Sequence, residues 1–297
     1  MTRVLEFEDI SRSYKPGVPV LDGVSFGVTE GEVVGLVGRN GAGKTTLLRI
    51  AMGMLVPHKG RVSVFGLSPV EHPIEVKKRV GYVSEDQVLP ANSSIADLIA
   101  FHEYLFPKWD RDLQKTLLDR FGLSIDTKIK SLSKGQARQV ALLLAICHRP
   151  ELLILDEPAG GLDPAARREF LEASIQLLNR EGSAILFSSH HMGDIERIGA
   201  RVVLLDHGRV RLDMDLDRMR EEVCVAMIPK AWVKDAAALE RVPGCLGVRD
   251  VYDDWHAVFD GDPESVRLRL RGPVTAASQI QCVRAPLEEL FVELVGK

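Results

Sequence analysis

The residues best suited to chemistry lie in a glycine-rich segment, where residues 38–45 read Gly-Arg-Asn-Gly-Ala-Gly-Lys-Thr with the spacing G-x-x-x-x-G-K-T. Glycines let a backbone fold tightly around an anion and point several N–H groups toward it. Lys44 would reach the terminal phosphates of a nucleotide, and the Thr45 hydroxyl would ligate Mg²⁺. The segment is therefore predicted to bind a nucleoside triphosphate. Its candidate binding residues are Gly38, Arg39, Asn40, Gly41, Ala42, Gly43, Lys44, Thr45 and Thr46.

Two predicted elements position this loop. Residues 32–37 are an apolar run typical of a buried strand, and residues 46–52 have the pattern of a helix. The N-terminus of a helix carries positive partial charge, which favours an anion at the loop. The alternative is a glycine-rich turn that binds nothing, and the order of strand, loop, lysine and threonine disfavours it.

A second apolar run, residues 152–155, ends in two acids, Asp156 and Glu157. The carboxyl ends of strands are the edge at which open α/β sheets bind ligands. Asp156 is predicted to hold Mg²⁺, directly or through water. Glu157 is one residue further along, so it would point differently and polarise the attacking water.

A third segment, residues 132–136, reads Leu-Ser-Lys-Gly-Gln. Ser133 and Gln136 have the spacing of a helix-capping box before the apolar helix predicted at residues 140–146. The serine hydroxyl, the Gly135 N–H and the helix N-terminus together would also form an anion site. One nucleotide does not need two anion sites, so the second would serve a nucleotide held by another subunit.

These motifs, in this order, resemble those of the ATP-binding cassette (ABC) ATPases over roughly residues 3–215. Residues 38–45 resemble the P-loop, residues 132–136 the signature motif and residues 152–157 the second Walker motif. The resemblance implies that ATP with Mg²⁺ is sandwiched between two cassettes paired head to tail. The P-loop of one subunit would hold the nucleotide, and Ser133 and Gly135 of the other would cap it.

Three further roles are implied by the resemblance alone. Asp163, within residues 161–163, would belong to the D-loop, and it also has the position of a helix cap before Pro164. His190, within residues 188–190, would contact the γ-phosphate. Tyr14 would stack on adenine, although an exposed loop aromatic is the alternative.

Two positions depart from the pattern of the family. Lys134 stands where the signature usually has glycine. The family also places a glutamine after the strand predicted at residues 79–83, where it contacts Mg²⁺ and the attacking water. The aligned residue here is Glu85, and a carboxylate is a good Mg²⁺ ligand. Gln87 would take that place if the loop slipped by two residues.

The composition places bounds on function. The chain has 297 residues, a net charge of −4 and 45% hydrophobic residues, so no overall basic signal points to nucleic acid. No apolar run approaches the roughly 18 residues that would cross a bilayer, and the N-terminus lacks a signal-peptide pattern. We expect a cytoplasmic protein, peripheral on the inner face of the cell membrane. The four cysteines are far apart and are expected to be reduced thiols.

The predicted fold is α/β, a P-loop NTPase of ABC type. Its parts are a mostly parallel sheet flanked by helices, antiparallel N-terminal strands, a helical subdomain at about residues 88–150, and a small C-terminal α+β module. The cassette is expected to span residues 1–218 and the module residues 219–297. The module has the order β-α-β-β-α-β of a ferredoxin-like unit, with a helix predicted at residues 229–239 and a strand at residues 278–283. A terminal amphipathic helix follows at residues 286–295, and it would pack either on its own domain or on a partner.

The resemblance implies an ATPase subunit that powers a separate transmembrane permease. The terminal helix resembles that of ABC ATPases from exporter systems with a separate membrane chain, which favours export. A homodimer and a heterodimer with another cassette both remain open, and the alternative function is a soluble ABC ATPase with a regulatory, nucleic-acid or ribosome-linked role. Many large apolar residues follow Glu85, and some of them should form an exposed docking patch. They are Leu89, Ile95, Leu98, Phe101, Tyr104, Leu105, Phe106 and Trp109.

Overall fold

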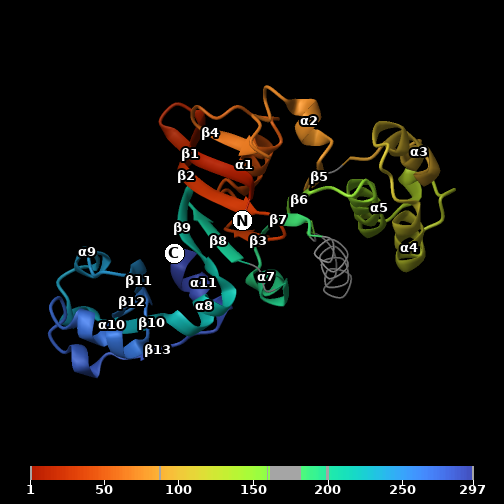
Figure 1. Ribbon diagram of the computed structural model, residues 1–297. Coiled ribbons are helices and arrows are strands. Elements are labelled where there is room, and N and C mark those ends of the chain that lie inside the picture. Colours follow the sequence, from red (N-terminus) through yellow and green to blue (C-terminus); the bar gives the residue numbers. More distant parts are fainter. Residues whose placement is uncertain (1, 87, 159, 161–181, 199–200, 296–297) are drawn as a thin grey trace.

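The computed structural model describes residues 2–86, 88–158, 160, 182–198 and 201–295. An antiparallel sheet opens the fold (Figure 1). It has the order β2-β1-β4, with strands β1 (Arg3–Lys15), β2 (Val18–Thr29) and β4 (Lys59–Val64). Residues 15–17 read Lys-Pro-Gly, a sequence typical of a turn, and they join the first two strands, with Lys15 opposite Val18. Alternate residues on the inner face are buried, as expected of a sheet with one solvated face.

A second sheet of six strands has the order β5-β6-β7-β3-β8-β9. Its strands are β3 (Val33–Val37), β5 (Val80–Val83), β6 (Leu152–Leu155), β7 (Ala184–Ser189), β8 (Arg201–Asp206) and β9 (Arg209–Asp215). The first five strands in this order run parallel, and β9 is antiparallel to β8. Their near-continuous aliphatic sequences suit strands covered on both faces. In register, Val37 pairs with Ser189 and Val83 with Leu155, so the loops after β3, β5, β6 and β7 meet at one edge.

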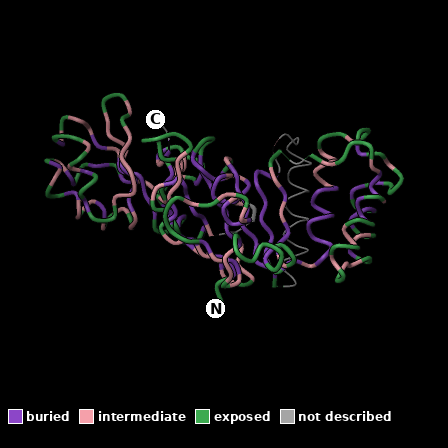
Figure 2. Tube along the Cα trace, turned by 90° about the horizontal axis from the view of Figure 1, so that it is seen from above, coloured by how far each residue is buried: buried purple, intermediate pink, exposed green. Residues whose placement is uncertain are grey.

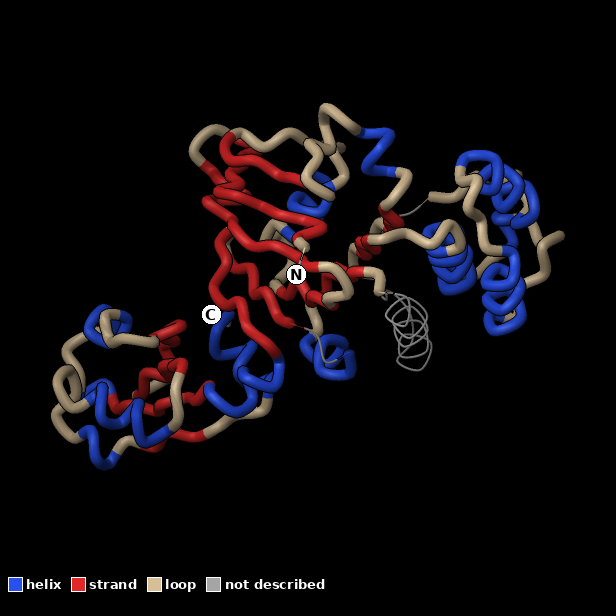
Figure 3. The backbone as a smooth tube through the Cα atoms, in the orientation of Figure 1, coloured by secondary structure: helices blue, strands red, loops and turns tan. Residues whose placement is uncertain are grey.

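Helices cover this sheet and extend beyond its β5 edge. Helix α1 (Lys44–Ala51) follows the glycine-rich loop, and α2 (Pro73–Lys77) and α7 (Met192–Ile198) are short. Helices α3 (Ile95–Leu105), α4 (Arg111–Phe121) and α5 (Lys134–Ile146), with the 3-10 turn η1 (Ile129–Ser131), form a separate layer beyond β5 (Figure 3). The sequence also predicts a capping box at Ser94 and Asp97, which precede an apolar helical pattern, and this box is present on α3. The box predicted at Ser133 and Gln136 is present on α5.

The C-terminal part builds its own four-stranded sheet after α8 (Leu216–Glu222). The sheet has the order β11-β12-β10-β13, all antiparallel, which is the strand order of a ferredoxin-like unit. Its elements are β10 (Val223–Pro229), η2 (Lys230–Trp232), α9 (Ala236–Glu240), β11 (Cys245–Val251), β12 (Asp254–Asp260), α10 (Pro263–Leu270), η3 (Ala277–Gln279) and β13 (Gln281–Val283). The division at residue 218 stays a prediction.

Two predicted elements of this part differ from the structure. The helix expected at residues 229–239 begins only at Ala236, because Pro229 still pairs with Asp254 in the sheet and Asp235 caps the helix by accepting from Ala238 N. The strand expected at residues 278–283 is reduced to β13, because a 3-10 turn occupies its first residues. In both places tertiary pairing decides the boundary.

The last helix, α11 (Leu287–Val295), returns to the rest of the chain. It packs on α7, β11 and β12, and its buried residues are Leu287, Leu290, Glu293 and Val295. The helix therefore packs on its own chain, which is the first of the two alternatives raised above. Buried segments run through the sheets, and the surface loops are exposed (Figure 2). None of the described helices is long and apolar enough to span a bilayer.

Candidate functional site

The glycine-rich loop needs glycine at Gly43 because of the backbone conformation there, and at Gly38 because there is no space for a side chain. Gly43 has a φ of 106°, and a Cβ there would lie 2.7 Å from Leu21 Cδ2. A Cβ on Gly38 would lie 2.4 Å from the carbonyl oxygen of Leu205. The loop therefore leads tightly into α1, which begins at Lys44. The Lys44 ammonium is buried and donates to the Gly38 carbonyl at 2.7 Å.

Asp156 lies at the end of β6, fully buried beside this loop. Its Oδ1 accepts hydrogen bonds from Thr45 Oγ1 at 3.2 Å and from Ser188 Oγ at 2.8 Å. Its Oδ2 is buried and has no hydrogen-bond partner among the described residues. Burial raises the pKa of Asp156, and the nearby Glu157 carboxylate raises it further, while the bonds from Ser188 and Thr45 oppose the shift. A carboxylate oxygen held dry beside a threonine hydroxyl is suited to a divalent cation.

Glu157 contacts three other residues of the site. Its Oε1 lies 3.2 Å from Lys44 Nζ, and its Oε2 lies 2.8 Å from His190 Nδ1. Its backbone N–H donates to Ser188 Oγ at 2.8 Å. The residue has a φ of 45°, in the left-handed region that side chains other than those of Gly, Asn and Asp rarely occupy. Strained backbone of this kind is concentrated at functional sites.

Lys44, Thr45 and Glu157 open onto a cavity of about 500 Å³, the P-loop cavity. Its lining includes both the glycine-rich loop and Glu157, and the members are Tyr14, Val20, Arg39, Asn40, Gly41, Gly43, Lys44, Thr45, Thr46, Glu85 and Glu157. The Tyr14 hydroxyl lies 3.2 Å from Thr46 Oγ1, and 56% of the residue's surface is exposed. The ring is thus anchored at the rim of the cavity and open to a planar ligand, with the guanidinium carbon of Arg12 5.4 Å from its centroid.

Comparison with known proteins identifies the family. Residues 21–160 match the family model described as ABC transporter. The Nod factor export ATP-binding protein I of Sinorhizobium fredii (strain NBRC 101917 / NGR234) is 33% identical over 99% of this chain and 86% of its own length. The chain belongs to the ABC transporter family. It is therefore an ATP-binding subunit that hydrolyses ATP to power transport by a separate membrane-spanning partner.

Two other relatives match less of this ABC subunit. The ABC transporter ATP-binding protein YtrB of Bacillus subtilis (strain 168) is 31% identical over 74% of each chain. A solved structure of the ATP-binding subunit of an ABC transporter is 30% identical, with a TM-score of 0.66, and the match covers 73% of this chain and 92% of that one. The predicted ABC fold is confirmed by these likenesses.

The signature-like residues of this ABC subunit do not line the P-loop cavity. Ser133, Gly135 and Gln136 are at the N-terminus of α5, where Gln136 N donates to Ser133 Oγ at 3.2 Å and Ser133 N donates to Gln136 Oε1 at 3.0 Å. None of the three lines the cavity around Lys44. Within one chain the structure therefore brings together the Walker motifs and His190 but not the signature. Asp163 lies outside the described residues.

Glu85 lies on the loop after β5, and it borders the cavity. Partial burial raises its pKa, and the carboxylates of Asp156 and Glu157 raise it further. Gln87, the other candidate for this position, lies outside the described residues. The placement of Glu85 favours its alignment with the family's glutamine.

Ser188 is a site residue that the sequence reasoning did not assign a role. Its hydroxyl donates to Asp156 and accepts from the Glu157 backbone, so one side chain orients both acids. The available signal was a polar residue at the end of an otherwise aliphatic strand, completely buried in the structure. The predicted motif around His190 included Ser188 only as context.

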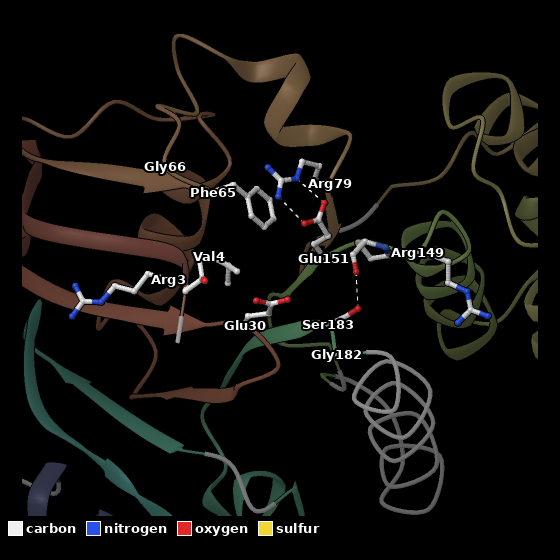
Figure 4. Close-up of a pocket in the computed structure, with 12 residues that line it drawn as sticks. Arg3, Val4, Glu30, Phe65, Gly66, Arg79, Arg149, Glu151, Gly182 and Ser183 are labelled. Carbon is white, nitrogen blue, oxygen red and sulfur yellow. Dashed lines mark hydrogen bonds and ion pairs between the residues drawn. The ribbon is translucent and has the colours of Figure 1, made fainter.

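A second cavity of about 470 Å³ lies at the opposite ends of the parallel strands (Figure 4). Arg79 there makes two hydrogen bonds of 2.6 Å to Glu151, and its guanidinium carbon lies 3.7 Å from the centroid of the Phe65 ring. The Ser183 hydroxyl donates to the Pro150 carbonyl at 2.7 Å. These polar groups satisfy one another at the amino ends of the strands, which is not the edge where such sheets bind ligands.

Proposed function

We propose that this chain is the cytoplasmic ATPase subunit of an exporter, working as a head-to-tail pair with ATP and Mg²⁺ at the interface. One observation carries the proposal: the P-loop cavity holds Lys44 and Glu157, while the N-terminus of α5 with Ser133 and Gly135, which the sequence predicts to be a second anion site, lies outside it. A single chain therefore supplies two halves of a nucleotide site that cannot serve the same nucleotide. Pairing two chains head to tail would complete both sites.

The ATP phosphates would lie on the backbone N–H groups of residues 38–46 and at the N-terminus of α1. Lys44 is ion-paired with Glu157 in the structure. A triphosphate in the loop would attract the Lys44 ammonium and leave Glu157 available as general base for the attacking water. His190, on the other carboxylate oxygen, would orient Glu157 and contact the γ-phosphate.

The residues present fit Mg²⁺. Thr45 and the buried, unbonded Oδ2 of Asp156 would hold it, with Glu85 as a further ligand. Few protein ligands suffice, because Mg²⁺ usually keeps several waters and phosphate oxygens. When bound, it would neutralise part of the charge on the phosphate oxygens.

Export is favoured by the relative that matches nearly the full length. The Nod factor export protein aligns with 99% of this chain, and so with nearly all of its C-terminal part, whereas YtrB aligns with 74%. A surface for the membrane partner is available on α3, where Phe101, Tyr104 and Leu105 are exposed and Ile95 and Leu98 are buried. This pattern supports the docking patch expected from the sequence, since three large apolar residues share one exposed helix face.

Mixing two inactive variants tests the head-to-tail homodimer. Ser133→Glu blocks the cap and leaves the P-loop intact. Lys44→Ala disables the P-loop and leaves the cap intact. Each variant alone should lack ATPase activity, and a mixture should regain part of it, because a mixed pair contains one complete site. Wild-type protein diluted with Lys44→Ala serves as control. No regained activity would rule out a homodimer of this geometry.

A further inference from the structure

Arg138 joins three parts of the cassette that belong to different elements. It lies in the second turn of α5, and its guanidinium is partly buried. Nη1 donates to the carbonyl oxygens of Glu157 at 2.7 Å and Pro158 at 2.9 Å, and Nη2 donates to the carbonyl of Glu85 at 3.2 Å. The loops after β5 and β6 are thus tied to one side chain of the helix that begins at the signature-like motif.

Of the three carbonyls that accept hydrogen bonds from Arg138, that of Glu157 belongs to a residue with strained backbone. Glu157 adopts a left-handed backbone conformation, and such a conformation persists only where its surroundings hold it. Its carbonyl also accepts from Gly160 N at 3.0 Å. Hydrogen bonds from a charged donor are roughly twice as strong as neutral ones. The Arg138 bond therefore contributes to the direction in which the Glu157 side chain leaves the backbone.

An arginine is suited to this place for a geometric reason. Its planar guanidinium presents several N–H groups in a fixed fork, whereas lysine offers one compact charge. Within the described part of the chain, the hydrogen bonds of Arg138 all go to carbonyls, and no carboxylate lies within ion-pair distance of it. The carboxylates of Glu85, Asp86 and Glu157 nevertheless favour its charged form, while burial lowers the pKa of Arg138. Arg138 thus holds three backbone carbonyls by hydrogen bonds and is not the ion-pair partner of a single described acid.

We propose that Arg138 is a positioning residue for hydrolysis, which couples the N-terminus of α5 to the subunit's own Glu157 and Glu85. This rests on the proposed function, in which Ser133 and Gly135 contact the nucleotide of the other subunit. Arg138 lies five residues after Ser133, about one and a half helical turns along α5. A shift of α5 when it engages that nucleotide would move the three carbonyls with it, and the general base would reach its working position only in the closed pair.

The test measures kcat and KM for ATP in Arg138→Met and Arg138→Lys, with Arg120→Met as matched control. Arg120 lies exposed at the end of α4 in the same helical layer. Misplacing a catalytic group by about 1 Å costs about 10²-fold. We expect kcat to fall about 10²-fold in Arg138→Met and about tenfold in Arg138→Lys, with KM changed less than threefold. The control should match wild type.

The two variants also separate positioning from folding. Circular dichroism and thermal unfolding establish whether each is folded, and if Arg138→Met is not, Arg138→Lys decides. Wild-type kcat in a folded Arg138→Lys, or a loss of activity that only follows the loss of folded protein, would overturn the proposal. Either result leaves the proposed function standing, because wild-type hydrolysis and the mixing experiment are measured separately. A wild-type protein that does not hydrolyse ATP would instead refute the proposed function.

Discussion

Two buried glutamates in this chain have the same kinds of neighbours in different surroundings. Glu157 lies 3.2 Å from a lysine ammonium and 2.8 Å from a histidine nitrogen. Glu293, on α11, lies 3.3 Å from Arg249 Nη1 and 3.0 Å from His256 Nδ1. Both carboxylates are less than a tenth exposed. Residue types and distances alone therefore do not distinguish a catalytic cluster from a structural one.

The surroundings make the distinction. Glu157 stands at the carboxyl ends of parallel strands, on strained backbone, at the edge of a cavity of about 500 Å³. Glu293 lies between α11 and the hairpin of β11 and β12, where its partners come from the sheet that the helix covers. A ligand can reach the first cluster, and a bound triphosphate would draw Lys44 away from Glu157, so we propose that this cluster is the reactive one. The second attaches a helix to a sheet.

Replacing Glu157 by Gln should produce the largest effect. The amide keeps the shape of the side chain but cannot accept the proton of the attacking water, and removing a general base typically costs about 10²–10⁴-fold in turnover. ATP binding should persist, and size-exclusion chromatography with ATP and Mg²⁺ should show a shift from monomer to dimer. A variant that hydrolyses ATP at the wild-type rate would exclude Glu157 as the base.

Lys44→Ala should lower affinity for the triphosphate by about 10–10²-fold, because hydrogen bonds to charged groups contribute about 1.5–3 kcal/mol each. The loop should keep its shape, since the glycines and α1 determine it. Nucleotide titration by calorimetry measures the change, and circular dichroism checks the fold. Equal binding by the variant and wild type would contradict the assignment of the loop.

Glu293→Gln makes the matched change in the structural cluster. The variant removes the negative charge that faces Arg249 and His256 and weakens the hydrogen bonds to them, so the free energy of unfolding should fall by about 1.5–3 kcal/mol. Turnover per folded molecule should stay within about twofold of wild type, because Glu293 does not line the P-loop cavity and its hydrogen bonds go to Arg249 and His256. Urea unfolding and ATPase assays together test this contrast. Reduced turnover in a stable Glu293→Gln would end the distinction between the clusters.

The sequence predicted those parts of the site that depend on local order. The P-loop, the acids after β6 and both capping boxes are each contained in a few adjacent residues, and the structure has them at the expected places. The contacts of Ser188 and Arg138 were not predictable in this way, since each joins residues 19 to 53 positions apart along the chain. The predicted start of the helix at residues 229–239 was wrong for the same reason, because sheet pairing at Pro229 overrides local propensity.

Glu85→Ala should have the smallest effect, and it tests the one family position that the sequence left open. Glu85 borders the cavity and is largely exposed, with only part of its side chain buried, so removing its carboxylate should lower Mg²⁺-dependent hydrolysis by only a few fold. Stimulation by the membrane partner should weaken more than basal turnover, since the same loop leads toward the apolar face of α3.

The acid side of the pH profile sharpens this prediction. Because burial and the neighbouring carboxylates raise the pKa of Glu85, it takes up a proton at higher pH than an ordinary glutamate. Its contribution as a Mg²⁺ ligand is thus present above that raised pKa and lost as the pH falls through it. Glu85→Gln should therefore move the acid limb of kcat/KM to lower pH, with Asp86→Asn as the control on the neighbouring exposed acid. If basal rate, stimulated rate and pH profile all stay as in wild type, Gln87 fills the position and the register is shifted by two residues.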